Sequence, residues 1–252
     1  MFKTTAVYFS PTGGTERGVL AIARALDEQA DVLNFTKPSP PKEISFGPDD
    51  LVVFGSPVYS GRLPSPAALR FSQLHGNQTP CIVTVTYGNR HYDDALLELS
   101  DLVSSRGFVP IAAAALVAQH TYGEIQVGRP DEQDLAQDRA FAENVLQKLQ
   151  EGRRTPPAIE GNYPYKESGA GSFHPRTDET CIHCGLCVVE CPVGAISWED
   201  DARIDPALCI SCFRCIMVCP TGAKNMNTPA YRTFAAAFSQ KLSQRRENEY
   251  LL

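Results

Sequence analysis

The sequence has 252 residues, of which 43% are hydrophobic and 21% are charged, and its formal net charge is −6. This length allows one large domain or two smaller ones, and the composition is ordinary for a globular protein. The negative charge argues against nucleic acid as a partner, since phosphate binding requires a basic face. The longest apolar run, 111–118, is too short to cross a bilayer, and no secretory signal is visible. We therefore expect a cytoplasmic protein without a membrane span.

Residues 1–151 alternate between short apolar segments and longer amphipathic ones. The apolar segments predict buried parallel strands, strongest at 5–9, 51–55 and 81–87 and weaker at 31–35 and 111–118. The amphipathic segments predict helices at 15–29, 65–76, 93–106 and 131–151. Ser65-Pro66 is a helix start signal, and Gly107 is expected as a left-handed stop. This alternation indicates an α/β fold whose parallel sheet is covered by helices on both faces.

A loop of hydroxyls and glycines follows the first predicted strand, in the stretch YFSPTGGT at 8–15. It is neither a nucleotide P-loop nor a dinucleotide fingerprint, because it lacks both G-x4-G-K-[ST] and G-x-G-x-x-G. Backbone amides at the start of a helix bind an anion without a nearby cation, and hydroxyls add hydrogen bonds. The loop therefore predicts a phosphate site, with a plain turn and a capping threonine as the alternative. Its candidate residues are Ser10, Thr12, Gly13, Gly14 and Thr15.

Two further loops follow the third and fourth predicted strands, GSPVYSGRLP at 55–64 and TYGNRHYDD at 86–94. Because parallel strands end at one edge of a sheet, both loops converge on the hydroxyl loop. With these three loops and the pattern [ST]-x-T-G-x-T, segment 1–151 resembles the flavodoxin family. The resemblance implies a flavodoxin-like doubly wound sheet of five parallel strands that binds FMN, with the phosphate in the first loop and the flavin between the other two. It implies flavin contacts from Ser56, Pro57, Val58, Tyr59, Gly61, Arg62, Thr86, Tyr87, Gly88, Asn89, Arg90, Tyr92 and Asp93.

Several of these side chains have an ordinary structural alternative. Tyr59 and Tyr87 either stack on the flavin or belong to the core, and Arg62 and Arg90 either lie near the flavin or face solvent. His120 follows the last predicted strand of this segment. We expect it at the surface, with a proton donor above the flavin as the alternative.

Eight of the nine cysteines lie in an internal repeat, CIHCGLCVVECP at 181–192 and CISCFRCIMVCP at 209–220. Each copy reads C-x2-C-x2-C-x3-C-P, in which three thiolates wrap one cluster and the fourth ligates the other. The spacing assigns Cys181, Cys184, Cys187 and Cys219 to one [4Fe–4S] cluster and Cys191, Cys209, Cys212 and Cys215 to a second. Structural zinc and disulfides are the alternatives, but zinc sites usually pair two C-x2-C knuckles across a longer gap. Near the repeat, His183 is expected at the surface and Trp198 in a core.

The repeat resembles the bacterial two-cluster ferredoxin domain at all eight ligand positions. The whole chain resembles flavodoxin–ferredoxin fusion proteins of anaerobic-type metabolism, and HTYGEIQVGRPDEQD at 120–134 and RRENEYLL at 245–252 are also similar to that group. We therefore expect four parts. They are a flavodoxin-like FMN domain at 1–151, a linker at 152–174, a small α+β ferredoxin-like domain at 175–228 and a helical tail at 229–252.

These parts predict a redox protein that passes electrons between two [4Fe–4S] clusters and FMN. The expected donor is a low-potential carrier such as ferredoxin, and FMN then delivers electrons to a protein acceptor. The alternative is a ferredoxin-coupled FMN reductase that acts on a small molecule, which requires the 120–130 loop or the tail to roof the flavin. The sequence leaves both open. A redox partner protein, ferredoxin or a reductase, is expected in either case, and a homodimer is compatible with the sequence.

Overall fold

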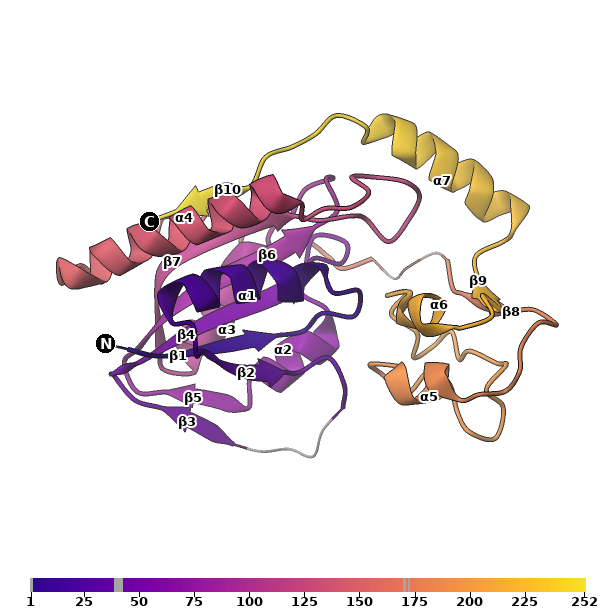
Figure 1. The fold of residues 1–252 in the computed structure, drawn as a ribbon, viewed down its shortest axis with the longest axis horizontal. Coiled ribbons are helices and arrows are strands. Elements are labelled where there is room, and N and C mark those ends of the chain that lie inside the picture. The colour runs from indigo at the N-terminus through magenta and orange to yellow at the C-terminus, as the bar shows by residue number, and fades with distance from the viewer. Residues whose placement is uncertain (1, 39–42, 170, 172) are drawn as a thin grey trace.

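The computed structural model describes residues 2–38, 43–169, 171 and 173–252. At its centre lies a six-stranded sheet in the order β10-β7-β6-β4-β1-β2 (Figure 1). Five strands run parallel, and β10 pairs antiparallel with β7. The strands are β1 Lys3–Tyr8, β2 Asp31–Asn34, β4 Asp50–Pro57, β6 Thr79–Tyr87, β7 Phe108–Val117 and β10 Glu249–Leu251. Counted along the chain, the parallel strands have the order 2-1-3-4-5, which is that of the flavodoxin-like doubly wound fold.

Helices cover both faces of this sheet. On one face, α1 (Gly14–Leu26) and α4 (Glu132–Gln150) bury an apolar cluster that includes Ile22 and Phe141. On the other face, α2 (Ser65–Phe71) and α3 (Ala95–Ser105) bury a second cluster. Because both faces are covered, β6 is buried at every residue and carries no polar alternation. The predicted α/β fold with its parallel sheet is therefore confirmed.

The predicted helices differ from the observed ones mainly at their ends. The second helix stops at Phe71 rather than near Gly76, because Leu74–Gly76 forms the short strand β5 and pairs with β3 (Ile44–Phe46). Gly107 has a φ of 87° and follows the end of α3, as predicted. At Gly55 on β4, a Cβ atom would lie 2.1 Å from a methyl group of Val19, so this glycine lets α1 lie close to the sheet.

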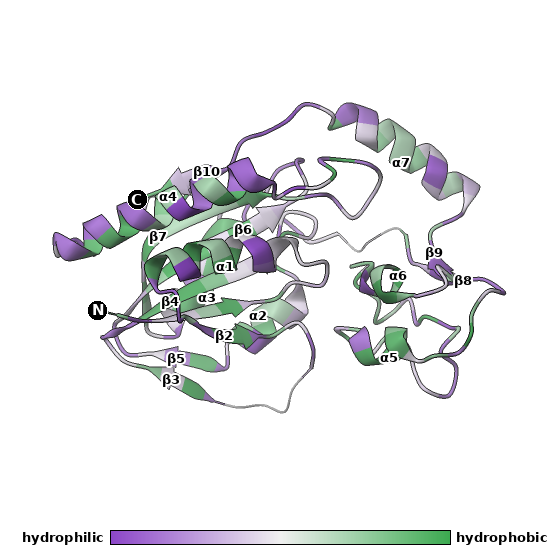
Figure 2. Ribbon diagram, in the orientation of Figure 1, coloured by the Kyte–Doolittle hydropathy of each residue, from purple (hydrophilic) through white to green (hydrophobic). Residues whose placement is uncertain are grey.

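The eight repeat cysteines lie in a small unit beside the sheet, at the right of Figure 1. Its elements are the helices α5 (Leu186–Glu190) and α6 (Arg214–Val218) and the antiparallel pair β8 (Arg176–Thr177) and β9 (Lys224–Asn225). Figure 2 shows α5 and α6 as largely apolar and α4 as striped with polar residues on its outward side. Among the described residues, no helix has the length and hydropathy needed to span a membrane.

The C-terminal tail returns from the small unit to the sheet. Helix α7 (Pro229–Lys241) leads away from β9, and the chain then forms β10 on the free edge of β7 (Figure 1). Tyr250 packs on the α1–α4 side, whereas Leu251 packs on the other side. The sequence predicts the helix of this tail and five parallel strands, but it does not predict the sixth strand.

Candidate redox site

The eight repeat cysteines gather in two groups of four. The first cysteine group, Cys181, Cys184, Cys187 and Cys219, lines a cavity of about 290 Å³. The second cysteine group, Cys191, Cys209, Cys212 and Cys215, lines a cavity of about 310 Å³. Each group takes three residues from one copy of the repeat and one from the other. This is the grouping that the spacing predicts, and ligation of a [4Fe–4S] cluster by each group stays a prediction.

A left-handed residue shapes each copy of the repeat. Gly185 has a φ of 70° and precedes α5, and Phe213 has a φ of 61° and precedes α6. Each turn directs the chain into the short helix that carries the third cysteine. At Gly185 a Cβ atom would lie 2.2 Å from the ring of Trp198, so the indole lies directly on this glycine. Trp198 is nevertheless 67% exposed, and the prediction of a core residue is wrong because this small unit has little core to bury it.

The thiols of the second group are deeply buried. Burial raises the pKa of Cys212 and of Cys215 to about 12. Both thiols therefore carry protons at neutral pH, and binding of iron at this cavity requires that they release them. The first group is more open, and Cys184 is exposed. The two cavities thus offer the same donor set in different surroundings.

Backbone amides point at the sulfur atoms of both groups. In the second group, the N–H of Ala195 donates to Cys191 Sγ at 3.3 Å and the N–H of Ser211 donates to Cys209 Sγ at 3.4 Å. In the first group, the N–H of Lys224 donates to Cys219 Sγ at 3.5 Å. Hydrogen bonds to cysteine sulfurs are one of the features that set the reduction potential of an iron–sulfur cluster. A four-cysteine cavity with such donors suits an iron–sulfur cluster well.

Charged side chains distinguish the two cavities, because Lys224 and Asp201 line the first and no charged residue is among the described residues that line the second. Lys224 is 1% exposed and lines the first cavity. Its Nζ donates to Thr177 Oγ1 at 2.6 Å and to the Asp201 carbonyl at 2.5 Å. At the equivalent position of the other copy, Ile196 lines the second cavity.

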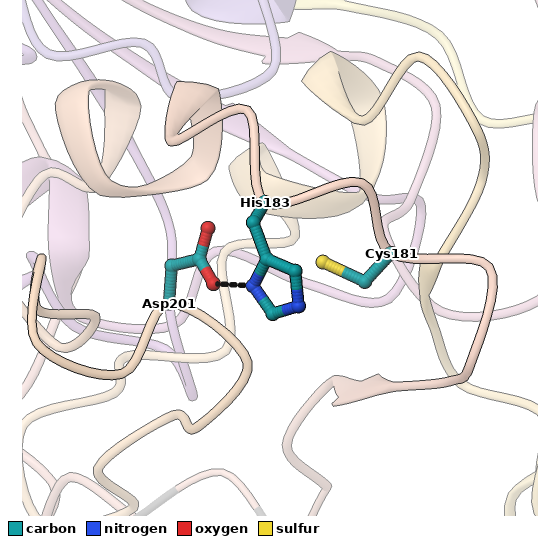
Figure 3. Close-up of side chains that lie close together, drawn as sticks. All are labelled: Cys181, His183 and Asp201. Atoms are coloured by element: carbon teal, nitrogen blue, oxygen red, sulfur yellow. Dashed lines mark hydrogen bonds and ion pairs between the residues drawn. The ribbon is translucent and has the colours of Figure 1, made fainter.

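Cys181, His183 and Asp201 form a close trio at the edge of the first cavity (Figure 3). His183 Nδ1 lies 2.6 Å from a carboxylate oxygen of Asp201, and the imidazole side chain is 70% exposed, as expected for a surface histidine. Figure 3 shows the Cys181 sulfur on the far side of the ring from Asp201. Because Cys181 also lines the four-cysteine cavity, the trio belongs to that site.

The hydroxyl loop connects β1 to α1. Ser10 is buried, its N–H donates to Thr36 Oγ1 at 2.8 Å, and its Oγ accepts from the N–H of Glu16 at 3.0 Å. Gly13 has a φ of 84° and turns the chain into α1. Among the hydrogen bonds of the described residues, the N–H groups from Thr12 to Thr15 have no acceptor. Free amides at the start of a 13-residue helix suit a phosphate.

The second loop, 58–62, turns sharply after β4. Gly61 has a φ of 86°, and reciprocal backbone hydrogen bonds of 2.9 and 3.1 Å join Tyr59 and Arg62. The guanidinium of Arg62 donates to both carboxylate oxygens of Glu98 at 2.8 Å and to the carbonyl of Lys166. Arg62 is thus already paired with α3 and the linker segment.

The third loop, 86–93, contains two buried polar atoms without a partner. Thr86 Oγ1 and the Tyr87 hydroxyl make no hydrogen bond within the described part of the chain. Unpartnered buried hydroxyls at the end of a parallel strand suit a polar ligand. Arg90 and Asp93 pair with each other, and Asp93 also pairs with Lys166 at 2.9 Å. The second and third loops meet where the N–H of Val58 donates to the carbonyl of Thr86.

The C-terminal tail lies across the third loop. Asn89 is buried, and its Nδ2 donates to the carbonyls of Leu242 and Gln244 at 2.8 and 2.7 Å. Its Oδ1 accepts from the N–H of Arg246 at 3.1 Å. Tyr92 donates to Glu249 at 2.7 Å. These tail contacts could not be found from the sequence, because the residues lie about 150 positions apart and share no motif.

His120 connects the third loop to the tail. Its ring lies so close to Gly88 that a Cβ atom there would be 2.3 Å away, and it meets Phe238 of α7 edge-on at 5.2 Å. Burial lowers the pKa of His120 to about 4, so it is neutral at pH 7. His120 is therefore half-buried rather than a surface residue. The segment after it also reaches α7, because the N–H of Glu124 donates to Ser239 Oγ at 2.9 Å.

The second cysteine group borders the loops at the carboxyl end of the sheet. Burial raises the pKa of Tyr59 well above its usual range, and the nearby thiols of Cys212 and Cys209 add to this effect. The ring of Phe213, next to Cys212, lies 5.2 Å from the ring of Tyr122. The second loop and the segment after β7 thus both reach the second cysteine group.

Hydrogen bonds fix the small unit against the sheet at the same place. Arg214 donates to the carbonyl of Pro11 in the hydroxyl loop at 3.3 Å and also pairs with Glu190. Arg70 of α2 donates to the carbonyl of Pro192 at 2.5 Å, and Lys37 pairs with Glu190. No sequence motif marks these contacts. They place the second cysteine group, rather than the first, beside the hydroxyl loop.

Residues 180–223 match the family model described as a 4Fe-4S dicluster domain. No curated protein matches the sequence. Similar solved structures include a flavodoxin from the domain Archaea, with 13% identity and a TM-score of 0.40 over 59% of this chain and 99% of that one. Flavodoxin 1 from Bacillus cereus shows 16% identity and a TM-score of 0.42, and the match covers 57% of this chain and 97% of that one. A WrbA-like flavodoxin from Agrobacterium tumefaciens shows 17% identity and a TM-score of 0.40, and the match covers 60% of this chain and 99% of that one.

The strand order and the family match define the class of protein. The sheet has the flavodoxin-like order, and residues 180–223 of the segment after it match the 4Fe-4S dicluster domain model. The chain thus joins a flavodoxin-like domain to a ferredoxin-type domain, as the sequence predicts for a flavodoxin–ferredoxin fusion. Because four-cysteine iron–sulfur clusters of this type transfer electrons, the chain is a redox protein of the electron-transfer class.

Proposed function

We propose that the protein passes electrons between two [4Fe–4S] clusters and one FMN within a single chain. The two cysteine groups hold the clusters, and the hydroxyl loop holds the FMN phosphate through its free amides and the hydroxyls of Thr12 and Thr15. The second and third loops hold the flavin. A low-potential carrier such as ferredoxin supplies the electrons.

The position of Tyr59 carries this proposal. Tyr59 belongs to the loop expected beside the flavin, and the nearby Cys212 and Cys209 thiols add to the effect of burial in raising the pKa of its hydroxyl. In the same region, Arg214 of the cluster unit donates to Pro11 of the hydroxyl loop. An electron passing between the second cluster and the flavin therefore has a short path through packed protein.

The residues of the chain position the cofactors and exclude water. FMN accepts one or two electrons, whereas each cluster carries one, so FMN couples single-electron supply to two-electron chemistry. Tyr59, Phe213 and Tyr122 fill the space beside the second cysteine group with aromatic side chains. Arg70 and Arg214 hold the two domains at a fixed separation.

Anaerobic titration of the reconstituted protein with reduced ferredoxin tests this relay. We expect the cluster absorption to bleach first and the absorption bands of the flavin to bleach after it. In Cys212→Ala, FMN stays bound but is no longer reduced. Bleached clusters with FMN that remains oxidised in the unsubstituted protein would refute the relay.

The covered third loop favours a small-molecule reductase over a carrier that serves a protein acceptor. The tail reaches this loop through Asn89, and His120 and α7 lie over Gly88. Such a cover limits the access of a protein to this edge but admits a small molecule.

Asn89→Ala releases the tail. Under the reductase alternative this lowers turnover of the small-molecule acceptor, whereas under the carrier alternative it speeds transfer to a protein acceptor.

A further inference from the structure

The first cysteine group opens onto an apolar surface. Ile182 and Leu186 line its cavity and are 62% and 44% exposed. Trp198 lies on Gly185, directly before Leu186 in the chain, and is 67% exposed. We name these three side chains, Ile182, Leu186 and Trp198, the apolar patch. The exposed thiol of Cys184 lies between its first two members in the sequence.

Several residues that line the second cavity pack against the sheet domain. Phe213 is 7% exposed and packs against Tyr122, and Pro192 is buried and accepts a hydrogen bond from Arg70. Ile210 packs against the core of the sheet domain. The first cavity therefore has exposed apolar side chains at its rim, whereas part of the lining of the second cavity is covered by the sheet domain.

Exposed carboxylates lie close in the sequence to members of the apolar patch. Glu179 lies two residues before Cys181, and Glu199 and Asp200 follow Trp198 directly. All three are exposed, and within the described part of the chain none of them forms an ion pair. Arg203 is the exposed cation in the same turn. By contrast, Glu190 faces the sheet domain and pairs with Lys37 and Arg214.

An apolar centre with an acidic rim has the character of an electron-transfer interface. Buried apolar side chains exclude water and bring two cofactors close, while charges at the rim speed encounter and orient the partner. A like-charged partner is repelled, and the chain itself carries a net charge of −6. A second copy of this chain would bring the same acidic rim and is therefore disfavoured on this surface.

We propose that the apolar patch is the docking surface for a one-electron carrier protein whose cofactor edge lies in an apolar centre ringed by lysine or arginine. This proposal rests on the proposed function, because it assumes a cluster in the first cysteine group. One electron crosses at each encounter. One partner's cofactor is oxidised by one electron, the other is reduced by one, and no bond is formed or broken.

Stopped-flow oxidation of the reduced holoprotein by ferric cytochrome c, a basic one-electron acceptor, tests the surface. We compare the unsubstituted protein with Glu199→Lys/Asp200→Lys and with Trp198→Ser. The charge variant lowers the second-order rate constant at low ionic strength at least fivefold and flattens its salt dependence. Trp198→Ser lowers the rate constant without changing the salt dependence.

A matched variant separates local docking from total charge. Glu28→Lys/Glu143→Lys makes the same change in net charge on exposed positions of the sheet domain. This control variant retains most of the second-order rate constant of the unsubstituted protein. Equal losses in both charge variants, or no loss in either, would overturn the proposal.

Two further measurements keep the result unambiguous. Iron content and visible absorption show whether each variant retains its clusters, so loss of the clusters is distinguished from loss of docking. A colourless unsubstituted protein refutes the proposed function instead.

Light scattering identifies the other possible occupant of the apolar patch, a second copy of the chain. A dimer that Trp198→Ser converts to a monomer would show that a second copy covers the patch, and would overturn the proposal.

Discussion

The segments that follow the two copies of the cysteine repeat differ at a buried position, Lys224. This lysine is buried beside the first cysteine group, where the other copy of the repeat has Ile196. Its Nζ donates to a hydroxyl and to two carbonyls, and none of these is a carboxylate. A buried positive charge stabilises the reduced cluster, which is the more negative form. Under the proposed function, two clusters held by these cysteine groups should therefore differ in potential although their ligands are the same.

We expect Lys224→Met to lower the midpoint potential of the first cluster. At an effective dielectric constant of about 20, removal of one nearby unit charge is worth on the order of 1–2 kcal/mol. A redox titration followed by electron paramagnetic resonance measures the two potentials. Ile196→Met is the matched control beside the second cysteine group and should shift neither midpoint potential. Unchanged potentials in Lys224→Met would contradict this account.

Asp138 on α4 gives the protein a pH-dependent stability. Burial raises its pKa from 3.8 to about 7, and its carboxyl accepts from the hydroxyl of Tyr250 on β10 at 2.7 Å. The folded protein therefore holds a proton that the unfolded chain releases between about pH 4 and pH 7. The stabilisation is complete below pH 4 and is lost as the pH rises through 7, by about 4 kcal/mol at most.

We expect Asp138→Asn to remove most of this pH dependence and to be more stable than the unsubstituted protein at pH 8. Anaerobic thermal unfolding of the holoprotein between pH 5 and pH 8 measures the effect. Glu143→Gln changes an exposed carboxylate on the same helix and should keep the original profile. If the stability of Asp138→Asn and that of the unsubstituted protein fell equally as the pH rises from 5 to 8, another group would be responsible.

At the scale of elements, the hydroxyl loop depends on the start of α1. Its free amides lie at the start of a 13-residue helix, where an anion binds without a nearby cation, and Thr12 adds a hydroxyl to the same loop. We expect Thr12→Val to weaken FMN binding by about tenfold to a hundredfold, since a hydrogen bond to a charged group contributes about 1.5–3 kcal/mol. Flavin fluorescence during anaerobic titration of the apoprotein measures the affinity. Ser72→Ala alters an exposed hydroxyl-to-carbonyl contact elsewhere and should bind FMN normally.

The sequence predicts the elements that carry a strong local pattern. The parallel strands follow from apolar runs such as Leu51–Gly55, and the cysteine groups follow from their spacing. Strand β10 does not follow, because three residues, Glu249–Leu251, are too few to show a period and their pairing with β7 is non-local. For the same reason the bonds of Asn89 to the tail, and the pairing of Arg62 with Glu98, appear only in the structure.

At the scale of the whole molecule, the two domains are joined by contacts as well as by the chain. Arg70, Arg214 and Lys37 connect the sheet domain to the cluster unit, and α7 with β10 closes the molecule on the other side. The second cysteine group is thereby held at the loops that follow β1, β4 and β7. The first cysteine group includes the exposed Cys184, so under the proposed function this group would form the outer end of the electron path and the second group the inner end.

The rate at which the flavin is reduced after a rapid, substoichiometric reduction of the clusters tests the central claim most directly. If both cofactors exchange electrons inside one chain, this rate is first order and does not change when the protein is diluted tenfold. It also disappears in Cys212→Ala. A rate that falls in proportion to protein concentration, or clusters that stay reduced beside an oxidised flavin, would contradict the account.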